Sequence, residues 1–285
     1  FGGDAHPAGA AVTNVTEEYN GSAWSSGGNM NTARAYLNGV GQPNSALAIN
    51  GCIQPNGTTI TCVEQYNGST WSAVDPIFYL SQYLGGSAGS NDSSAIMAGG
   101  YSTANSTVVN TSLEWNGKTW SAGNVMPISQ GNQGDAGNIN SAHFFGGNVD
   151  GSRRSFKSVE YTKSLLQPFT YNAVVSTDSY SGGGKLITGR FYLGGAGETG
   201  DSSLAFGGIN PGNVTCTEEY NGSIWSAGGA LINAGVVEGA GSQNAALSIG
   251  ASATNTTDEY NGTAWGAGGT LITARRKGSG YGTQN

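Results

Sequence analysis

Residues 17–24, EEYNGSAW, decide the fold because the same phrase returns along the chain. An Asn-Gly pair tolerates positive φ at both central turn positions, so each copy predicts a β-hairpin closed by a type I′ turn. The flanking aromatic residues favour a pleated, half-buried surface and cross-strand pairing. The further copies are EQYNGSTW (64–71), LEWNGKTW (113–120), EEYNGSIW (218–225), DEYNGTAW (258–265) and a degenerate VEYTKSLL (159–166). The predicted structural pairs are Tyr19 and Trp24, Tyr66 and Trp71, Trp115 and Trp120, Tyr220 and Trp225, and Tyr260 and Trp265.

A second motif recurs with the same period of about 47 residues. Its copies are FGG (1–3), SALAING (45–51), SAIMAGG (94–100), SAHFFGG (141–147), SSLAFGG (202–208) and AALSIGA (245–251). A repeat of this length accommodates four short antiparallel strands, which make one propeller blade. In the first complete repeat we expect strands at 32–41, 45–51, 59–66 and 70–74, with Leu47 and Ile49 on one face of the second strand and Ala46 and Ala48 on the other.

The two ends of the chain complete each other. Residues 278–285 resemble the stretch that precedes the second strand elsewhere, as in 239–250, and residues 1–3 resemble the end of that strand. The sequence therefore predicts an all-β, six-bladed propeller over 1–285, a single domain with four antiparallel strands per blade. The N- and C-terminal strands would close one shared blade, and an enlarged insert would lie near 163–184.

Composition restricts the function classes. Only 10% of the 285 residues are charged, the net charge is −7 and no basic residue lies between Arg34 and Lys118. A duplex-binding face needs clustered basic residues, so we expect no nucleic-acid partner. No apolar run is long enough for a membrane helix, so we expect no membrane insertion. The polar surface rich in Ser, Thr, Asn and Gly is typical of extracellular or particle-surface proteins.

The three cysteines do not form a disulfide framework. Cys52 and Cys62 belong to one predicted hairpin, where a disulfide is one interpretation. Cys216 occupies the repeat position of Cys62 and is expected to be a small buried residue.

The glycine pair after the second strand, the aromatic in the third strand and the Trp that opens the fourth resemble the kelch repeat. The fuller pattern, which includes GGNMNTAR (27–34), GGKLITGR (183–190) and GGTLITAR (268–275), is similar to the kelch-like repeat proteins of tailed phages, especially of marine hosts. This resemblance implies a virion or extracellular surface location and a role in tail fibres or other appendages. Asn50-Gly51 and Gly250-Ala251 depart from the glycine pair, and the fourth repeat has no Trp.

Arg34, Arg190 and Arg275 share one repeat position, where the loop from the fourth strand enters the next innermost strand. Three guanidinium groups around one channel mouth would suit a carboxylate, sulfate or phosphate on a glycan. The alternative is structural: each arginine ties its own loop to backbone carbonyls. One acid per repeat precedes the aromatic, which is typical of a repeated structural hydrogen bond rather than of a glycosidase pair. These acids are Glu18, Glu114, Glu160, Glu219 and Glu259.

Few residues suggest a catalytic or metal site. His143 stands where other repeats have Leu or Ile, which indicates a core histidine, and His6 follows the first glycine pair. We therefore expect no cofactor, no metal and no enzymatic activity. Aromatic residues that break the repeat are better candidates for stacking on a ligand: Phe78, Tyr79 and Tyr83, with Phe169, Tyr171 and Tyr180 in the insert.

Two functions follow from the sequence. The first is a non-catalytic virion surface or tail-fibre-like propeller that docks on other virion or surface proteins, or on host surface glycans. The alternative is a secreted propeller lectin or glycan-active enzyme acting on acidic sugars.

Overall fold

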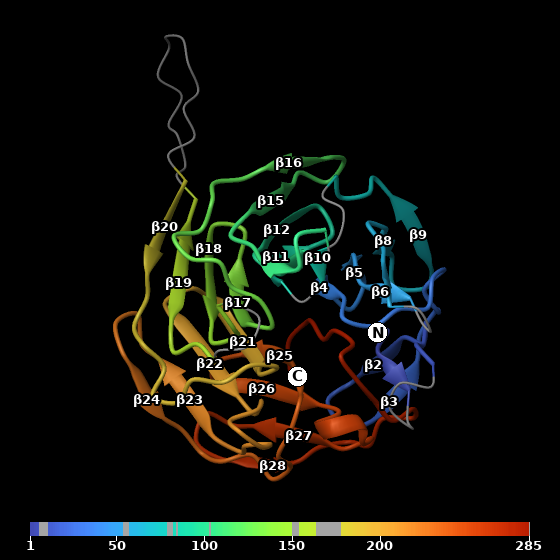
Figure 1. Cartoon of the computed structure of the whole chain (residues 1–285). Helices are drawn as coiled ribbons and strands as arrows, with labels where there is room; N and C mark the ends of the chain where they lie inside the picture. Colours follow the sequence, from blue (N-terminus) through green and yellow to red (C-terminus); the bar gives the residue numbers. More distant parts are fainter. Residues whose placement is uncertain are drawn as a thin grey trace.

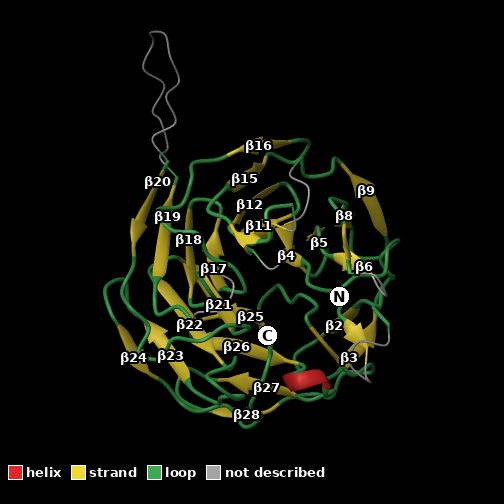
Figure 2. Cartoon of the chain, in the orientation of Figure 1, coloured by secondary structure: helices red, strands yellow, loops and turns green. Residues whose placement is uncertain are grey.

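The computed structural model describes residues 1–5, 11–53, 57–78, 82–83, 85–102, 104–149, 154–163 and 178–284. Within these ranges five antiparallel sheets of four strands surround a central channel (Figure 1). Nearly all regular structure is β, as the yellow strands of Figure 2 show, and the only helix of these ranges is the short η1 (Ala251–Ala253). No helix in the described part of the chain is therefore long and apolar enough to cross a membrane.

Each sheet runs from an innermost first strand to an outermost fourth strand. Sheet 1 is β4 (Asn38–Gln42), β5 (Ser45–Ile49), β8 (Val63–Tyr66) and β9 (Trp71–Val74). Sheet 2 is β11 (Gly86–Asn91), β12 (Ser94–Ala98), β15 (Ser112–Trp115) and β16 (Trp120–Ala122). Sheet 3 is β17 (Gly134–Asn138), β18 (Ser141–Phe145), β19 (Ser158–Thr162) and β20 (Ser179–Gly182). Sheet 4 is β21 (Gly194–Thr199), β22 (Ser202–Phe206), β23 (Thr217–Tyr220) and β24 (Trp225–Ala227). Sheet 5 is β25 (Glu238–Ser242), β26 (Ala245–Ile249), β27 (Thr257–Tyr260) and β28 (Trp265–Ala267).

Short pairs extend these sheets or bridge the chain ends. They are β1 (Asp4–Ala5) with β29 (Arg275–Arg276), β6 (Cys52–Ile53) with β7 (Thr58–Thr59), and β13 (Tyr101–Ser102) between β10 (Gln82–Tyr83) and β14 (Thr107–Val108). The arrangement is an all-β propeller with antiparallel four-stranded blades, as the sequence predicts.

The remaining sector is built differently, and we call it the closing sector. It consists of residues 1–3, the hairpin of β2 (Glu17–Tyr19) and β3 (Trp24–Ser26), and residues 278–284. The Phe1 ammonium donates to the Ser279 carbonyl at 3.0 Å, and the Ser279 N–H donates to the Phe1 carbonyl at 3.1 Å. The predicted meeting of the two chain ends in one sector is confirmed.

The expected sixth sheet of four strands is not found among the described residues: these form five such sheets, and within them β2 pairs with β3 alone. In sheet 1, β5 (Ser45–Ile49) pairs with β8, whereas in the closing sector the Phe1 backbone pairs with Ser279 and the Gly2 N–H donates to the Val15 carbonyl, just before β2.

The hairpin tips keep the predicted pairing but not the predicted turn. Tyr66 lies opposite Trp71 with ring centroids 4.9 Å apart, and the other four aromatic pairs face each other in the same way. In the turn, Gly68 has φ 88°, while Asn67 is not among the residues with positive φ. A single positive φ at a glycine in the first central position is the pattern of a type II′ turn. Asn67 instead accepts hydrogen bonds at Oδ1 from the N–H groups of Ser69 and Thr70, at 3.0 and 2.9 Å.

The innermost strand also begins later than expected, at Asn38 rather than near residue 32. Tyr36 has φ 57°, and Asn132, Tyr192 and Lys277 have positive φ at the same repeat position. A left-handed residue ends extended pairing. The residues before this position therefore form a loop that enters the innermost strand.

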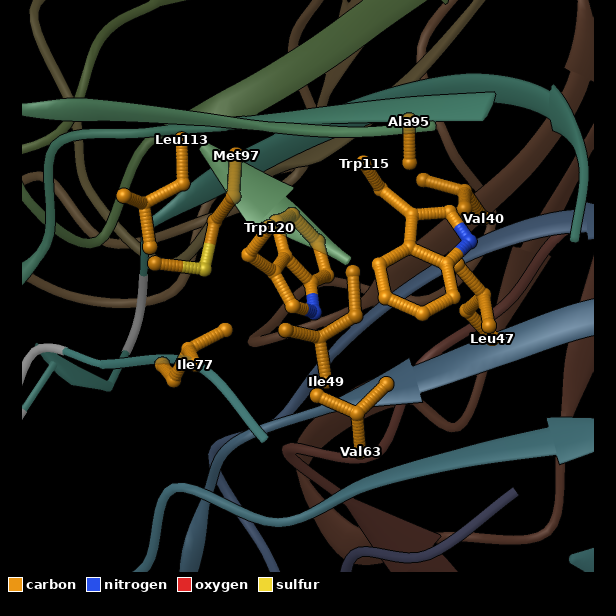
Figure 3. Packing of buried hydrophobic residues seen from close by; sticks show 10 residues of the cluster. All are labelled: Val40, Leu47, Ile49, Val63, Ile77, Ala95, Met97, Leu113, Trp115 and Trp120. Carbon is orange, nitrogen blue, oxygen red and sulfur yellow. The ribbon is translucent and has the colours of Figure 1, made fainter. Parts of the chain in front are cut away.

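The core lies between neighbouring sheets rather than inside one sheet. Leu47 and Ile49 point from sheet 1 toward Met97, Trp115 and other residues of sheet 2 (Figure 3). Ala46 and Ala48 point the other way and pack with Phe1 and Trp71. The predicted alternation of the second strand is confirmed, and it explains why wedge-shaped sheets with apolar faces on both sides stack around an axis.

Candidate functional site

The acid before each aromatic residue joins neighbouring sectors. The Tyr66 hydroxyl donates to Glu18 Oε1 at 2.6 Å, and the Tyr161 hydroxyl donates to Glu114 Oε1 at 3.1 Å. The same bond links Tyr220 to Glu160, Tyr260 to Glu219 and Tyr19 to Glu259. Burial, with the adjacent glutamate, raises the pKa of Tyr220 and Tyr260 to about 12, so these hydroxyls remain donors. The prediction of a repeated structural hydrogen bond is confirmed.

One seam between sheets has a different chemistry. Gln65 replaces the glutamate of sheet 1, and Trp115 replaces the tyrosine of sheet 2. Gln65 donates through Nε2 to Asp92 Oδ2 at 2.5 Å, and Trp115 donates through Nε1 to the Asp92 carbonyl at 2.8 Å. Asp92 thus connects Gln65 and Trp115, which take the place of the glutamate and the tyrosine that bond each other at the other seams.

The three arginines are buried rather than open to a ligand. Arg34 and Arg190 have no exposed surface, and Arg275 is 4% exposed. Arg34 Nη2 lies 3.2 Å from Glu64 Oε1, and the corresponding partners of Arg190 and Arg275 are Glu218 and Glu17. Each guanidinium also donates to a backbone carbonyl, those of Ala48, Ala205 and Val15 respectively. This geometry supports the structural alternative and provides no guanidinium mouth for an acidic glycan.

Sequence reasoning missed these acidic partners. Glu17, Glu64 and Glu218 occupy one repeat position, two residues before the aromatic, and they occur in the three repeats whose loop carries the arginine. Where the loop has Gln130, the acid is replaced by Val159. The arginine and the acid thus occur together in the same repeats, and this pattern in the sequence could have indicated that they pair.

The buried acids also hold the loops that connect an outermost strand to the next innermost strand. The N–H groups of Ile187 and Thr188 donate to Glu218 at 2.7 and 3.1 Å. Ile272 and Thr273 donate in the same way to Glu17 at 2.8 and 3.1 Å. Each carboxylate therefore fixes the backbone of one loop as well as its arginine.

The same loops expose apolar side chains. Phe78, Ile187, Ile232 and Ile272 share one repeat position, and their exposed fractions are 54, 57, 54 and 58%. In a sheet of four antiparallel strands, all connections from an outermost to an innermost strand emerge on one side of the ring. Phe156, 49% exposed, lies against Gly189 of one such loop. We call this side, marked by these five residues, the loop face.

The central channel is lined by the innermost strands and is rich in glycine. It has a volume of about 350 Å³ and is lined by six segments: 39–42, 87–90, 135–138, 195–198, 239–241 and 280–283. Any Cβ at Gly195 would lie 2.1 Å from the Asp135 carbonyl oxygen, and at Gly239 it would lie 2.1 Å from the Gly195 carbonyl oxygen. Glycine is required at both positions because neighbouring innermost strands touch through their backbones.

Two carboxyl groups of the innermost strands have raised pKa values: Asp135 lines the channel, and Glu238 directly precedes the lining residue Gly239. Asp135 accepts a hydrogen bond at Oδ2 from the Ser87 N–H, and Ser87 Oγ donates to the Gly39 carbonyl at 3.2 Å. Burial raises the pKa of Asp135 to about 7 despite that hydrogen bond. Burial likewise raises the pKa of Glu238 to about 7, against the opposing influence of the Phe1 ammonium. Neither carboxyl was anticipated from the sequence.

The histidine and the cysteines occupy structural positions. His143 is fully buried, its Nδ1 lies 3.0 Å from Ser203 Oγ, and its ring packs on Tyr220 and Trp225. Burial lowers its pKa to about 3, so the imidazole is neutral, in accord with the predicted core role. His6 lies outside the described residues.

The disulfide interpretation is wrong, because Cys52 and Cys62 are free thiols. Cys52 lies opposite Thr59 in the β6–β7 pair, so the two cysteines do not face each other. Cys216 is also free, but it is half-buried rather than buried as expected. Among the described residues, no three His, Cys, Asp or Glu side chains gather as a metal site would require.

Most of the aromatic residues proposed for ligand stacking are not placed. Tyr79, Phe169 and Tyr171 lie outside the described residues, and only the backbone of Tyr83 is described, in β10. Phe78 is exposed on the loop face. Tyr180 is half-buried in β20, opposite Tyr161 at a ring distance of 5.1 Å.

Comparisons with known proteins bear on the fold alone. No family model matches the chain, and no curated protein matches its sequence. Among solved structures, that of YjhT is similar with a TM-score of 0.67 and 11% identity, over 90% of this chain and 90% of that one. At that identity the likeness concerns architecture and not activity, so the chain is similar to YjhT in being a β-propeller.

Proposed function

We propose that this protein is a non-catalytic binding module that docks on another protein through its loop face. The observation that carries the proposal is the exposed apolar residue at one position of four repeats. Apolar residues gathered on one side of a soluble protein are typical of interaction surfaces. The backbone beneath Ile187 and Ile272 is fixed by buried carboxylates, so this surface is formed before a partner arrives.

The charged groups that would suit the acidic-sugar alternative are engaged elsewhere. The arginines pair with buried glutamates, and the acids before the aromatics accept hydrogen bonds from tyrosines. A glycosidase needs two carboxylates free to reach one glycosidic bond. This use of the charges favours docking over hydrolysis.

Attachment to a host glycan is a second candidate function, and one observation favours it. Phe78 and Phe156 are aromatic, about half exposed and belong to the loop face. Aromatic rings that remain in water at a binding surface can stack on the apolar face of a sugar ring. In this reading the aromatic residues, and not the arginines, carry the binding.

We further propose a virion or extracellular surface location, in a tail fibre or comparable appendage. The support is the resemblance of residues 27–34, 183–190 and 268–275 to the kelch-like repeats of tailed phages. We also propose that the closing sector acts as a sixth blade beside the five sheets of four strands. Mass spectrometry of purified particles tests the location: the chain should copurify with particle proteins, and its absence from particles would overturn this part.

Site-specific photocrosslinking tests the docking surface. A photoreactive residue at position 272 should crosslink to another protein in the native source, whereas one at exposed Ser69, in a hairpin tip, should not. Equal crosslinking from both positions would contradict the proposal. A glycan array separates the second candidate: binding lost in the double variant F78A and F156A, but kept in the triple variant I187S, I232S and I272S, would favour sugar attachment.

A further inference from the structure

The central channel ends on the loop face in a cavity of about 90 Å³, which we call the channel mouth. Its lining residues fall within six segments: 37–39, 85–87, 132–135, 192–195, 236–239 and 277–280. These segments contain the first residues of innermost strands, such as Asn38 of β4 and Gly134 of β17. An innermost strand begins where the loop from the preceding outermost strand ends, so the mouth opens on the loop face.

Sheet 3 departs from the repeat at this mouth. By the register of the first two strands, Gln133 takes the place of Leu37, and Asp135 takes the place of Gly39. Both side chains reach toward sheet 2, because Gln133 Nε2 donates to the Ala98 carbonyl at 2.9 Å and Asp135 accepts from a backbone N–H of β11. Sheet 3 therefore brings two polar side chains together where sheet 1 has an apolar side chain and a glycine.

Side-chain polar atoms at the mouth have no hydrogen-bond partner. Gln133 is 8% exposed, and its buried Oε1 is unpartnered. The buried Oδ1 of Asn132 is unpartnered as well. Asn38 is 6% exposed with an unpartnered Nδ2, and a flip of its amide would present an oxygen at the same place. A buried oxygen without a donor is costly, so these atoms favour a ligand that donates hydrogen bonds.

The charges of the mouth favour a cation. Asp135 and Glu238 both line it, and the six described segments that line the channel contain no lysine or arginine. Lys277 also lines the mouth, but its Nζ donates to the Tyr36 hydroxyl and lies 3.5 Å from Asp4 Oδ2, so its charge is already paired. A cleft that carries acidic groups between low-dielectric walls concentrates cations.

We infer that the channel mouth binds a primary ammonium group at Asp135, with the side-chain oxygens of Gln133 and Asn132 as further acceptors. An ammonium has three N–H donors, one for each of these groups. The cavity has room for the ammonium and the end of its alkyl stem. A calcium ion fits less well, because it needs more carboxylate ligands and no three His, Cys, Asp or Glu side chains gather in the described part of the chain.

The source of the ammonium is a lysine side chain of the protein that docks on the loop face, so this part rests on the proposed function. The exposed Ile187, Ile232 and Ile272 stand on loops that lead to the mouth. A partner that contacts several of them would extend over the mouth and exclude water from it. An ion pair is stronger where water is excluded, so the apolar contacts and the central charge would reinforce each other.

Titration with N-acetyl-lysine N-methylamide at pH 8 tests the ammonium site without a partner. At this pH Asp135 is mostly ionised and the lysine side chain is still charged. The amide resonances of Ser87 and Gln133 should shift and saturate. The probe N-acetyl-norleucine N-methylamide, whose side chain ends in a methyl group, should leave them unchanged. Equal shifts with both probes, or no shift with either, would overturn the ammonium site.

Two variants with the same change of charge locate the binding. D135N should weaken binding of the lysine probe at least about tenfold. D201N, at an exposed residue between β21 and β22, should change the affinity by less than about twofold. Equal affinities of the two variants would show that the probe responds to net charge and not to the mouth.

Q133L alters the site without a change of charge. It gives sheet 3 the leucine that sheet 1 has at Leu37, and it removes one acceptor. The affinity for the lysine probe should fall by about three- to tenfold. An unchanged affinity would contradict the role of Gln133.

Photocrosslinking then tests the source of the ammonium. With a photoreactive residue at position 272, the parent and D201N should capture the same protein from the native source, and D135N should capture at least about fivefold less of it. Equal capture by D135N would overturn the partner lysine and leave the docking function standing. No capture by the parent would overturn docking and the partner lysine together, whereas the titration decides the ammonium site by itself.

Discussion

The seams between sheets and the loop face use the same repeats in opposite ways. At the seams, charged and hydroxyl-bearing residues are buried or half-buried and each has a partner, as for Tyr66 with Glu18 and Arg34 with Glu64. On the loop face, aliphatic residues such as Ile187 and Ile272 are more than half exposed. In this molecule, the charged residues that recur from repeat to repeat hold the sheets and loops together, whereas the exposed apolar residues that recur form a surface available for binding.

The largest test of this contrast is E218A. It removes the buried partner of Arg190 and leaves a guanidinium without compensation, which should cost about 3–5 kcal/mol of unfolding free energy. The matched control is D258A in sheet 5, where Asp258 accepts from the N–H and Nδ2 of Asn233 and the corresponding loop carries no arginine. Denaturant unfolding should give about 1–2 kcal/mol for the control. Equal losses would mean that the arginine pair has no special weight.

A smaller effect is expected from D135N, and it depends on pH. The folded pKa of Asp135 is raised to about 7, so the folded state binds more protons than the unfolded state between about pH 4 and 7. The Asp135 contribution to stability is therefore present at low pH and is lost as the pH rises toward 7.

The asparagine has no such titration, and its Oδ1 can still accept from the Ser87 N–H. Relative to the parent, D135N should gain on the order of 2 kcal/mol on going from pH 5 to pH 8. Thermal melts at the two pH values measure this difference. The same gain in G182A, an exposed glycine in β20 with no atom near its Cβ position, would show that the effect is unrelated to the carboxyl.

The tyrosine–glutamate bond is expected to contribute less. Y220F removes the hydrogen bond to Glu160 and the one that the hydroxyl accepts from the Gly184 N–H, and it keeps the ring against Trp225, so the loss should be about 1–2 kcal/mol. S226A, at an exposed residue of the neighbouring strand β24, is the control and should change stability by less than about 0.5 kcal/mol. If Y220F behaved like S226A, the seam bonds would be incidental to the fold.

The smallest effect on stability belongs to the loop face. I272S replaces an aliphatic side chain that is 58% exposed, so the unfolding free energy should change by less than about 0.5 kcal/mol. L271S, one residue earlier and buried, is the opposite control and should cost several times more. A large loss in I272S would mean that the residue supports the core rather than a binding surface.

Local patterns and internal repetition predicted most of the architecture. The hairpins, the aromatic pairs, the meeting of the chain ends and the role of the acid before the aromatic follow from residue types at fixed spacing. The turn type did not, because Asn67 acts through its side-chain carbonyl rather than through a positive φ. The propeller is similarly clear in the sequence, but only the structure shows that, among the described residues, β2 pairs with β3 and not within a sheet of four strands.

The site was less predictable for a physical reason. The repeat position of Arg34 and the possibility of a tie to a carbonyl were predicted, but its carboxylate partner lies 30 positions along the chain, in Glu64, and had to be found in space. Asp135 stands in an otherwise glycine-rich innermost strand, and nothing in its local sequence indicates that burial will raise its pKa. The pairing of Arg34 with Glu64 and the burial that raises the pKa of Asp135 both arise only when the ring is assembled.

The tyrosine–glutamate bonds all run in one direction around the axis, from Tyr66 back to Glu18 and onward to Tyr19 with Glu259. At these seams one sector supplies the tyrosine donor and its neighbour supplies the glutamate acceptor, whereas the seam between sheets 1 and 2 uses Gln65, Trp115 and Asp92 instead. Such a head-to-tail contact can form between any two sectors that carry this tyrosine and glutamate, so it does not determine the number of sectors in the ring. The angle between neighbouring sheets must set the number of sectors. Loss or duplication of one sector would therefore keep the contacts between sectors and change the curvature of the ring.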